Sequence, residues 1–303
     1  MIIQGVKKDK GFLFFRKPSL KLITNQGESA LSFFEVSSED LDQKLHGLEI
    51  AAAADFSSLT MRFSHPELIR QVQLAVFNSQ FQPQEFFSKG IKQLPRPMHT
   101  VLEKKNGIQF FVLSLNALSF EKAALANEEI ITFLRRKIKE PDSLSEEQIL
   151  EIIKEAIREA HLHHDFELRI GMNFSNALPL EKVREFIQKY NLLYVEQPSA
   201  SLEECKQLTE EFKTNAFITR PVYNEQEAKE LNINAALLSF LPIEQLSSLV
   251  TVLKEKKVNL FYALKEGEEA LAVALAFPVV KVSSKEKNSL KTFSSLKEKI
   301  KNI

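Results

Sequence analysis

The chain has 303 residues, enough for one large domain or two ordinary ones, and 44% of them are hydrophobic, as in proteins with a sizeable core. Its 40 basic and 40 acidic residues cancel, which argues against a broad electrostatic surface for nucleic acid. Cys205 is the only cysteine, so neither an intrachain disulfide nor a cysteine-based zinc site can form. The eight glycines form no G-x-G-x-x-G, P-loop or G-x-S-x-G motif.

The N-terminal stretch favours a protein that is neither secreted nor inserted in a membrane. Its short apolar run is interrupted by Arg16, Lys17 and Pro18, and no cleavage site of small residues follows. No segment of the chain approaches the ~20 apolar residues needed to span a bilayer. We therefore expect a cytoplasmic protein without a membrane or nucleic-acid partner, either a monomer or a homo-oligomer.

Residues 1–100 predict an α+β capping domain. Residues 11–36 indicate strands, with a turn at Asn25-Gln26-Gly27 between two β-prone runs. Helical spacing follows in residues 39–52 and 66–78. Residues 80–100 contain three prolines and no clear period, which is typical of a connector.

Residues 101–282 predict a (β/α) barrel, because apolar runs alternate with amphipathic stretches about eight times. Residues 283–303 are lysine-rich with apolar residues at helical spacing, and predict a C-terminal helix that packs back on the cap or the barrel. The fold class is therefore α/β. The expected strands are 108–115, 130–138, 166–172, 192–196, 216–219, 235–240, 258–264 and 278–282, and the expected helices are 144–160, 179–189, 201–213, 224–231 and 242–256.

Four stretches of sequence carry motifs that occur in the same order in a known family. They are RRKIKEPDSLSEEQILEIIKEAIREA, with a K-x-K pair at Lys137 and Lys139; FELRIGMNFSNALPLEKVREFI, in which the expected strand ends near Asn173; LLYVEQPSASLEE, with Glu196; and LSFFEVSSEDL, with Glu35. The first three resemble the second, third and fourth barrel strands of the enolase superfamily, with their K-x-K pair, D-x-N motif and terminal glutamate. The fourth resembles a segment of the family's capping domain, with Glu35 at its acidic position. The likeness is closest to the o-succinylbenzoate synthase branch in the muconate-lactonising-like subgroup.

The resemblance implies abstraction of a proton α to a carboxylate, with Mg²⁺ held by three carboxylates stabilising the enediolate. It implies that Lys139 is the general base or acid, that Lys137 is its electrostatic partner, and that Glu196 is a metal ligand with Asn173 nearby. On a strand, residues two apart share a face, so a strand at 130–138 would point both lysines into the barrel. The implied reaction is the dehydration of a cyclohexadiene carboxylate in menaquinone biosynthesis.

Three positions depart from the family pattern. The metal-binding aspartate of the third strand is replaced by Gly171, and the acidic ligand of the fifth strand by Arg220. The lysine of the sixth strand is replaced by Ser239. With two of three ligands replaced, the implied Mg²⁺ site is incomplete, and Arg220 could occupy the place of the metal and pair with Glu196. Arg220, Ser239 and Asn173 are then the candidate substrate-binding residues for a small carboxylate.

These departures leave three functions open. The first is an o-succinylbenzoate synthase-like lyase. The second is a catalytically inactive relative that binds a small molecule or a protein, and the third is a lyase that uses the lysine pair without metal. The cluster His161, His163, His164 and Asp165 lies between a helix and a strand, on the face opposite the expected chemistry, which favours solvated histidines. Cys205 adjoins Glu203 and Glu204, a setting that disfavours a thiolate.

Overall fold

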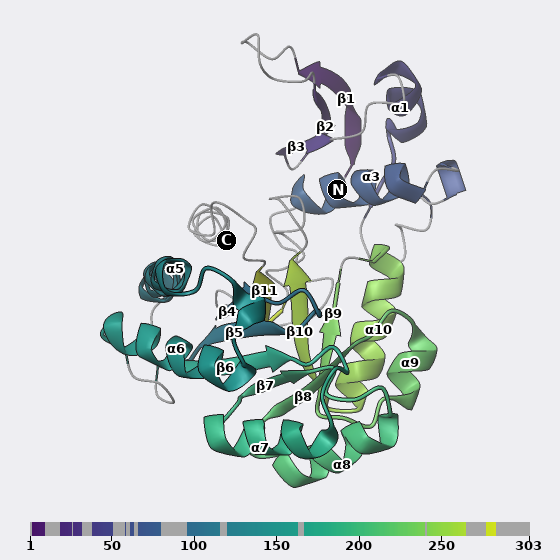
Figure 1. The fold of residues 1–303 in the computed structure, drawn as a ribbon. Coiled ribbons are helices and arrows are strands. Elements are labelled where there is room, and N and C mark those ends of the chain that lie inside the picture. The colour runs from purple at the N-terminus through teal and green to yellow at the C-terminus, as the bar shows by residue number, and fades with distance from the viewer. Residues whose placement is uncertain are drawn as a thin grey trace.

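A closed barrel of eight strands, surrounded by helices, forms the main body of the protein, and a three-stranded sheet with helices precedes it (Figure 1). The structure is a computed structural model that describes residues 2–9, 19–25, 27–31, 38–50, 58, 61–63, 66–79, 96–115, 120–162, 167–239, 241–264 and 277–282. The (β/α) barrel with an N-terminal α+β unit is therefore confirmed. The N-terminal elements are β1 (Ile3–Asp9), β2 (Ser19–Thr24), β3 (Gly27–Leu31), α1 (Ser38–Leu45) and α3 (Pro66–Ser79).

The barrel strands are β4 (Arg96–Glu103), β5 (Gln109–Ser114), β6 (Leu168–Asn173), β7 (Tyr194–Glu196), β8 (Phe217–Pro221), β9 (Ala235–Leu238), β10 (Asn259–Leu264) and β11 (Val279–Val282). The surrounding helices are α5 (Phe120–Lys137), α6 (Glu146–Glu159), α7 (Leu180–Tyr190), α8 (Leu202–Phe212), α9 (Glu225–Glu230) and α10 (Ile243–Glu255), with a short 3-10 helix, η2 (Pro141–Ser143), before α6.

One strand of the barrel runs against the others. The order around the barrel is β10-β11-β4-β5-β6-β7-β8-β9, in which β5 is antiparallel to both neighbours and every other pair is parallel. A tight turn at Gly107, whose φ of 86° suits glycine, joins β4 directly to β5. Consequently the first residue of β5, Gln109, lies at the same end of the barrel as the carboxyl ends of the parallel strands.

The expected strand at residues 130–138 is wrong, because these residues belong to helix α5 and the turn that follows it. The buried residues of this segment recur three or four positions apart, the period of a helix face, whereas a strand would bury every second residue. Three cations occupy the last turn of α5, where they complement the helix dipole. The buried apolar positions of α5 and the following turn are Ala123, Ala126, Ile130, Leu134 and Ile138.

The first barrel strand begins within the segment expected to be a connector. Strand β4 starts at Arg96, so the last five residues of 80–100 are part of the barrel, and the expected boundary at residue 101 falls inside a strand. Strand β1 was not expected, because alternate glycine and lysine residues weaken its apolar pattern. The turn between β2 and β3 and the helix from Pro66 follow the expectation, whereas α1 ends at Leu45, earlier than expected.

The N-terminal unit contacts the barrel at the carboxyl ends of the strands. Helix α3 carries Gln73, whose Nε2 donates a hydrogen bond of 3.2 Å to Glu244 Oε2 in the first turn of α10. Because α10 follows the carboxyl end of β9, this contact places α3 at the end of the barrel where (β/α) barrels carry their sites. Figure 1 shows β1, β2, β3, α1 and α3 together beyond this end of the barrel.

Large apolar side chains fill the centre of the barrel, as in other barrels of this size. Aromatic rings contact one another at its core: the rings of Phe111 and Tyr194 are 5.5 Å apart and edge to face, and those of Tyr194 and Phe261 are 4.9 Å apart and tilted. The interior is therefore a packed core with polar groups only near its ends. Its buried apolar members are Met98, Phe111, Leu113, Tyr194, Ala235, Leu237 and Phe261.

A buried histidine on β4 makes the fold sensitive to acid. His99 follows Met98 of the barrel interior, so strand alternation turns it to the outer side of the barrel, where burial lowers its pKa from 6.5 to about 3. When the pH falls below 6.5, the pKa of histidine in the unfolded chain, the unfolded chain binds a proton at His99 and the folded chain does not. The histidine therefore lowers the stability as the pH falls from 6.5 towards 3.

Replacing His99 by glutamine is expected to remove this part of the pH dependence. Between about pH 7 and about pH 5, the free energy of unfolding of the wild type should fall by about 2 kcal/mol more than that of the variant. Urea unfolding at both pH values measures this difference. Parallel pH curves for the two proteins would show that His99 is protonated in the folded state.

Several expectations concern residues outside the described ranges, among them Glu35, the helix at 283–303 and the residues His163, His164 and Asp165. His161 is described and is exposed, with a φ of 55°. Within the described ranges, no helix is both long enough and apolar enough to cross a bilayer.

Candidate functional site

Glu196 is a buried carboxylate at the carboxyl end of β7, with only 4% of its side chain exposed. Its Oε1 accepts a hydrogen bond of 3.2 Å from Asn173 Nδ2, and its Oε2 accepts one of 2.7 Å from the hydroxyl of Tyr194. Asn173 ends β6, whose backbone is paired in register with β7 at this point. The neighbouring strands β6 and β7 thus supply two donors to the carboxylate, and a third donor comes from a strand near the end of the chain.

Lys281 supplies this third donor. It lies on β11, the last strand of the barrel, and its Nζ is 2.7 Å from Glu196 Oε2 and 3.3 Å from Gln109 Oε1. The ammonium also lies 4.5 Å from the centre of the Phe111 ring, a cation–π contact, and 13% of the lysine side chain is exposed. We call these five residues, Gln109, Asn173, Tyr194, Glu196 and Lys281, the Glu196–Lys281 cluster.

Tyr194 acts only as a hydrogen-bond donor in this cluster. Burial raises its pKa well above 10, and the negative charge of Glu196 and the hydrogen bond to it raise it further. The phenol therefore stays protonated at every physiological pH, and its proton points at Glu196 Oε2. The cluster contains one anion and one cation, and its net charge is zero when both are ionised.

Gly171 leaves room for Tyr194. Strand β6 pairs with β7 so that Gly171 is opposite Tyr194, and a Cβ at position 171 would lie 2.8 Å from Tyr194 Cβ and 2.9 Å from its carbonyl oxygen. Real Cβ atoms do not approach other atoms so closely, because the overlap is strongly repulsive. The position where the resemblance implies a metal-binding aspartate therefore has no space for a side chain.

Lys137 and Lys139 do not join the cluster. Lys137 ends α5, on the outside of the barrel, where its Nζ is 3.2 Å from Glu155 Oε1 and half of its side chain is exposed. Lys139 is exposed beyond the helix end and donates a 3.3 Å hydrogen bond to the carbonyl of Arg135. Because Lys137 ends a helix, the two lysines do not share the inner face of a strand.

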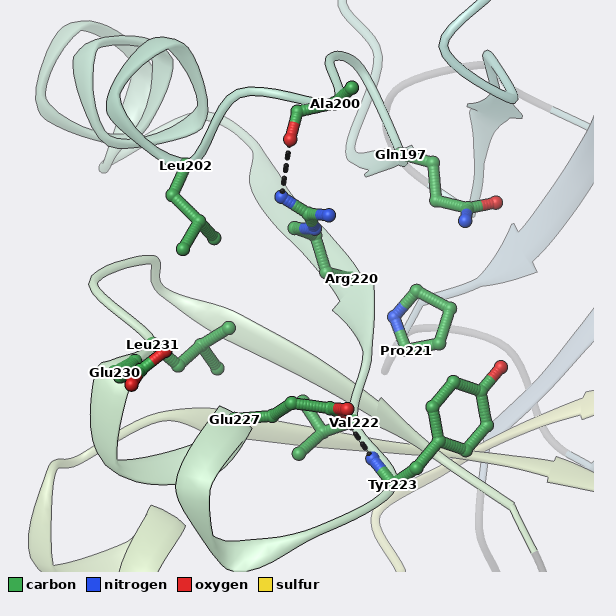
Figure 2. Close-up of a pocket in the computed structure, with 10 residues that line it drawn as sticks. All are labelled: Gln197, Ala200, Leu202, Arg220, Pro221, Val222, Tyr223, Glu227, Glu230 and Leu231. Atoms are coloured by element: carbon green, nitrogen blue, oxygen red, sulfur yellow. Dashed lines mark hydrogen bonds between the residues drawn. The ribbon is translucent and has the colours of Figure 1, made fainter.

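Arg220 does not pair with Glu196 either. Thr219, one residue before it, is in register with Glu196 along β8, so Arg220 is out of phase by one residue and belongs to the outer face of the barrel. Its Nη1 donates a hydrogen bond of 3.2 Å to the carbonyl of Ala200. Figure 2 shows the guanidinium in a pocket between β8 and the segments that lead into α8 and α9.

Ser239 follows β9 and is buried, with 8% of its surface exposed. It is two residues beyond Leu237 of the barrel interior, so strand alternation places it on the inner side. Of the six expected site residues, the structure brings together Asn173 and Glu196, leaves Ser239 on the same inner face, and puts Arg220, Lys137 and Lys139 outside the barrel.

The described residues do not fit the Mg²⁺ ion that the resemblance implies. Mg²⁺ prefers an octahedron of oxygen ligands at about 2.0–2.1 Å. Glu196 is the one carboxylate of the cluster, and the ammonium of Lys281 lies within 2.7 Å of it, where a cation ligated by Glu196 would lie. Within the described ranges, no three acidic, histidine or cysteine side chains gather as metal ligands would.

Sequence reasoning missed Lys281, Gln109 and Tyr194. A signal for Lys281 was present, because a single lysine in the apolar run PVVKV is unusual in a strand that helices and neighbouring strands should bury. Gln109 gave no such signal, since only the reversed direction of β5 brings it to this end of the barrel. Tyr194 resembled an ordinary core residue.

No protein-family model matches the sequence. No curated protein matches it either. Among solved structures, the fold is similar to a mandelate racemase/muconate lactonizing enzyme-like protein from Rubrobacter xylanophilus, with 9% identity, 94% of this chain and 87% of that chain covered, and a TM-score of 0.51. A second mandelate racemase/muconate lactonizing enzyme structure gives 10% identity, 96% and 87% coverage and a TM-score of 0.50.

The L-talarate dehydratase of Polaromonas sp. JS666, solved with Mg and L-glucarate, gives 11% identity, 89% and 81% coverage and a TM-score of 0.49. At these identities, likeness extends to the fold alone. The chain therefore has the capped-barrel fold of mandelate racemase/muconate lactonizing enzyme-like proteins.

Proposed function

We propose that this protein is an enolase-superfamily relative that has lost metal-dependent proton abstraction and acts as a binding module for a small molecule. The supporting observation is the buried pair of Lys281 and Glu196, 2.7 Å apart at the carboxyl ends of the barrel strands. In the implied mechanism, a divalent cation and several carboxylates stabilise the enediolate. Here a single ammonium, already paired with a carboxylate, takes that place.

The pair is suited to a structural role. A buried carboxylate is stable only when its charge is compensated and its oxygens accept hydrogen bonds, and Glu196 receives both from Lys281, Tyr194 and Asn173. A substrate carboxylate that approached Lys281 would have to compete with Glu196. Binding at a different site, which leaves the pair intact, is therefore the simpler function.

A dehydratase like o-succinylbenzoate synthase, acting in menaquinone biosynthesis in the cytoplasm, is the second candidate. It is favoured by one observation, that Lys281 and Glu196 form a potential acid–base couple at the end of the barrel where (β/α)-barrel enzymes carry out their chemistry. In this alternative Lys281 would exchange the proton instead of Lys139, and a small carboxylate would be the substrate.

A dehydration assay with the cyclohexadiene carboxylate substrate, combined with calorimetric titration of Mg²⁺, separates the two functions. We expect neither turnover nor heat of Mg²⁺ binding for the wild type. Lys137→Met, which removes a lysine from the outer helix, is the control for Lys281→Met. Turnover that requires Mg²⁺ and disappears in Glu196→Gln but persists in Lys137→Met would overturn the proposed binding function in favour of the lyase.

A further inference from the structure

A cavity of about 390 Å³ lies outside the barrel, between β8 and the segments that begin α8 and end α9 (Figure 2). Small-molecule sites usually have volumes of roughly 300–1,000 Å³, so a compact ligand would fit. None of the five residues of the Glu196–Lys281 cluster lines this cavity. It is therefore separate from the site inside the barrel.

Arg220 has N–H donors for which the described residues offer no acceptor. A guanidinium has five N–H donors, and the one conventional acceptor among the described residues is the carbonyl of Ala200. The thiol of Cys205, a weak acceptor, lies beside it. No carboxylate of the described residues lies within the 4.0 Å of an ion pair with Arg220, so an anion in the cavity could take the free donors in a two-point contact.

The walls beside Arg220 are apolar. Leu202 and Tyr223 line the cavity and are 46% and 51% exposed, which makes them two of the five large hydrophobic side chains that are most exposed in the described part of the chain. Leu231 lines the same cavity from the end of α9. An exposed apolar surface of this kind next to an unpaired cation is typical of a ligand site.

Helix α9 supplies two carboxylates, opposite in charge to Arg220, to the wall of the same cavity. Glu227 and Glu230 also line the cavity, and Figure 2 shows them on the α9 side, away from the end of the arginine side chain. Glu227 is held by hydrogen bonds of 2.7 Å from the backbone N–H of Tyr223 and from Asn224 Nδ2. A ligand that carried only a carboxylate would meet these two anions, whereas a ligand with a cationic group at its other end would gain from them.

We infer that this cavity binds a small zwitterion in which a short apolar chain joins a carboxylate to an amino group. The carboxylate pairs with Arg220, the chain packs on Leu202 and Leu231, and the ammonium faces Glu227 and Glu230. This inference rests on the proposed binding function and names its site and ligand class.

Calorimetric titration with three probes of equal chain length tests the inference. δ-Aminovalerate carries both charges, valerate only the carboxylate, and n-pentylamine only the ammonium. We expect δ-aminovalerate to bind at least about tenfold more tightly than either of the others, since each of them lacks one of the two charge-assisted contacts. Methyl NMR shifts of Leu202 and Leu231 locate the binding.

Three variants complete the test. Arg220→Met and the exposed Glu230→Gln should each weaken δ-aminovalerate binding at least about tenfold, and Arg184→Met, an arginine of α7 paired with Glu211, is the matched control that should leave it unchanged. Valerate binding as tightly as δ-aminovalerate would overturn the ligand class. Absence of binding by all three probes would overturn the inference. It would not affect the proposed loss of catalysis, which the assay for Mg²⁺-dependent turnover tests separately.

Discussion

Replacing Lys281 by methionine is expected to lower the free energy of unfolding by about 3–5 kcal/mol, the usual cost of leaving a buried charge without its partner. Glu196 would keep its hydrogen bonds from Tyr194 and Asn173 but lose the ammonium 2.7 Å away. Without the ammonium, a protonated carboxyl group is buried at a lower cost than an ionised one. The variant should therefore lose less stability at acidic pH than at neutral pH. Urea unfolding at neutral and acidic pH measures both effects.

Two controls show whether the effect belongs to the pair. The double variant Lys281→Met with Glu196→Gln removes both charges, and it should recover most of the lost stability because no uncompensated charge remains. Lys137→Met breaks an ion pair whose partners are 52% and 39% exposed, and should cost less than about 1 kcal/mol. Equal losses in Lys281→Met and Lys137→Met would contradict the buried pair.

The second large effect concerns Gly171→Asp, the change that would restore the aspartate implied by the resemblance. We expect a loss of at least about 3 kcal/mol, because overpacking costs about 1–3 kcal/mol and a second carboxylate is forced in beside Glu196. Gly171→Ala should lose less, since it brings the clash without the charge. Thermal unfolding and calorimetric Mg²⁺ titration of both variants measure the outcome.

A double variant tests the cause of this loss. The atoms closest to a new Cβ at position 171 are the Cβ and the carbonyl oxygen of Tyr194, which alanine would also have. Tyr194→Ala should therefore fail to rescue Gly171→Ala. A Gly171→Asp protein as stable as the wild type, or one that binds Mg²⁺ tightly, would show that this part of the barrel rearranges easily.

The Glu196–Lys281 cluster gives a physical account of the departures from the family pattern. Gly171 is required because the Cβ and the carbonyl oxygen of residue 194 fill the adjacent space, and the hydroxyl of Tyr194 donates to Glu196. Lys281 compensates the charge that a metal ion would otherwise compensate. The three features support one another, since each occupies or neutralises a part of the site that the resemblance assigns to the metal.

Much of the fold could be predicted from the sequence, because it depends on local patterns. Seven of the eight expected barrel strands occur where apolar runs were found, and Pro179 and Ser201 mark the starts of α7 and α8. The failure at 130–138 arose because a run of β-prone residues is also compatible with a buried helix, and only packing against β4 decides between them.

The sequence by itself determined that the chain alternates strands and helices into a barrel, because apolar runs alternate with amphipathic stretches. The resemblance to the enolase superfamily, and not the periodicity, implied that Glu196 ends a strand with Asn173 nearby. Only the tertiary structure decided which cation faces Glu196. Arg220 does not face Glu196, because Thr219 is the residue of β8 that is in register with it and the next residue points to the other face. Lys281 is 85 residues away from Glu196 in the sequence, and the closure of the barrel brings the two together. Closure and strand direction are properties of the whole sheet, and no local pattern of residues encodes them.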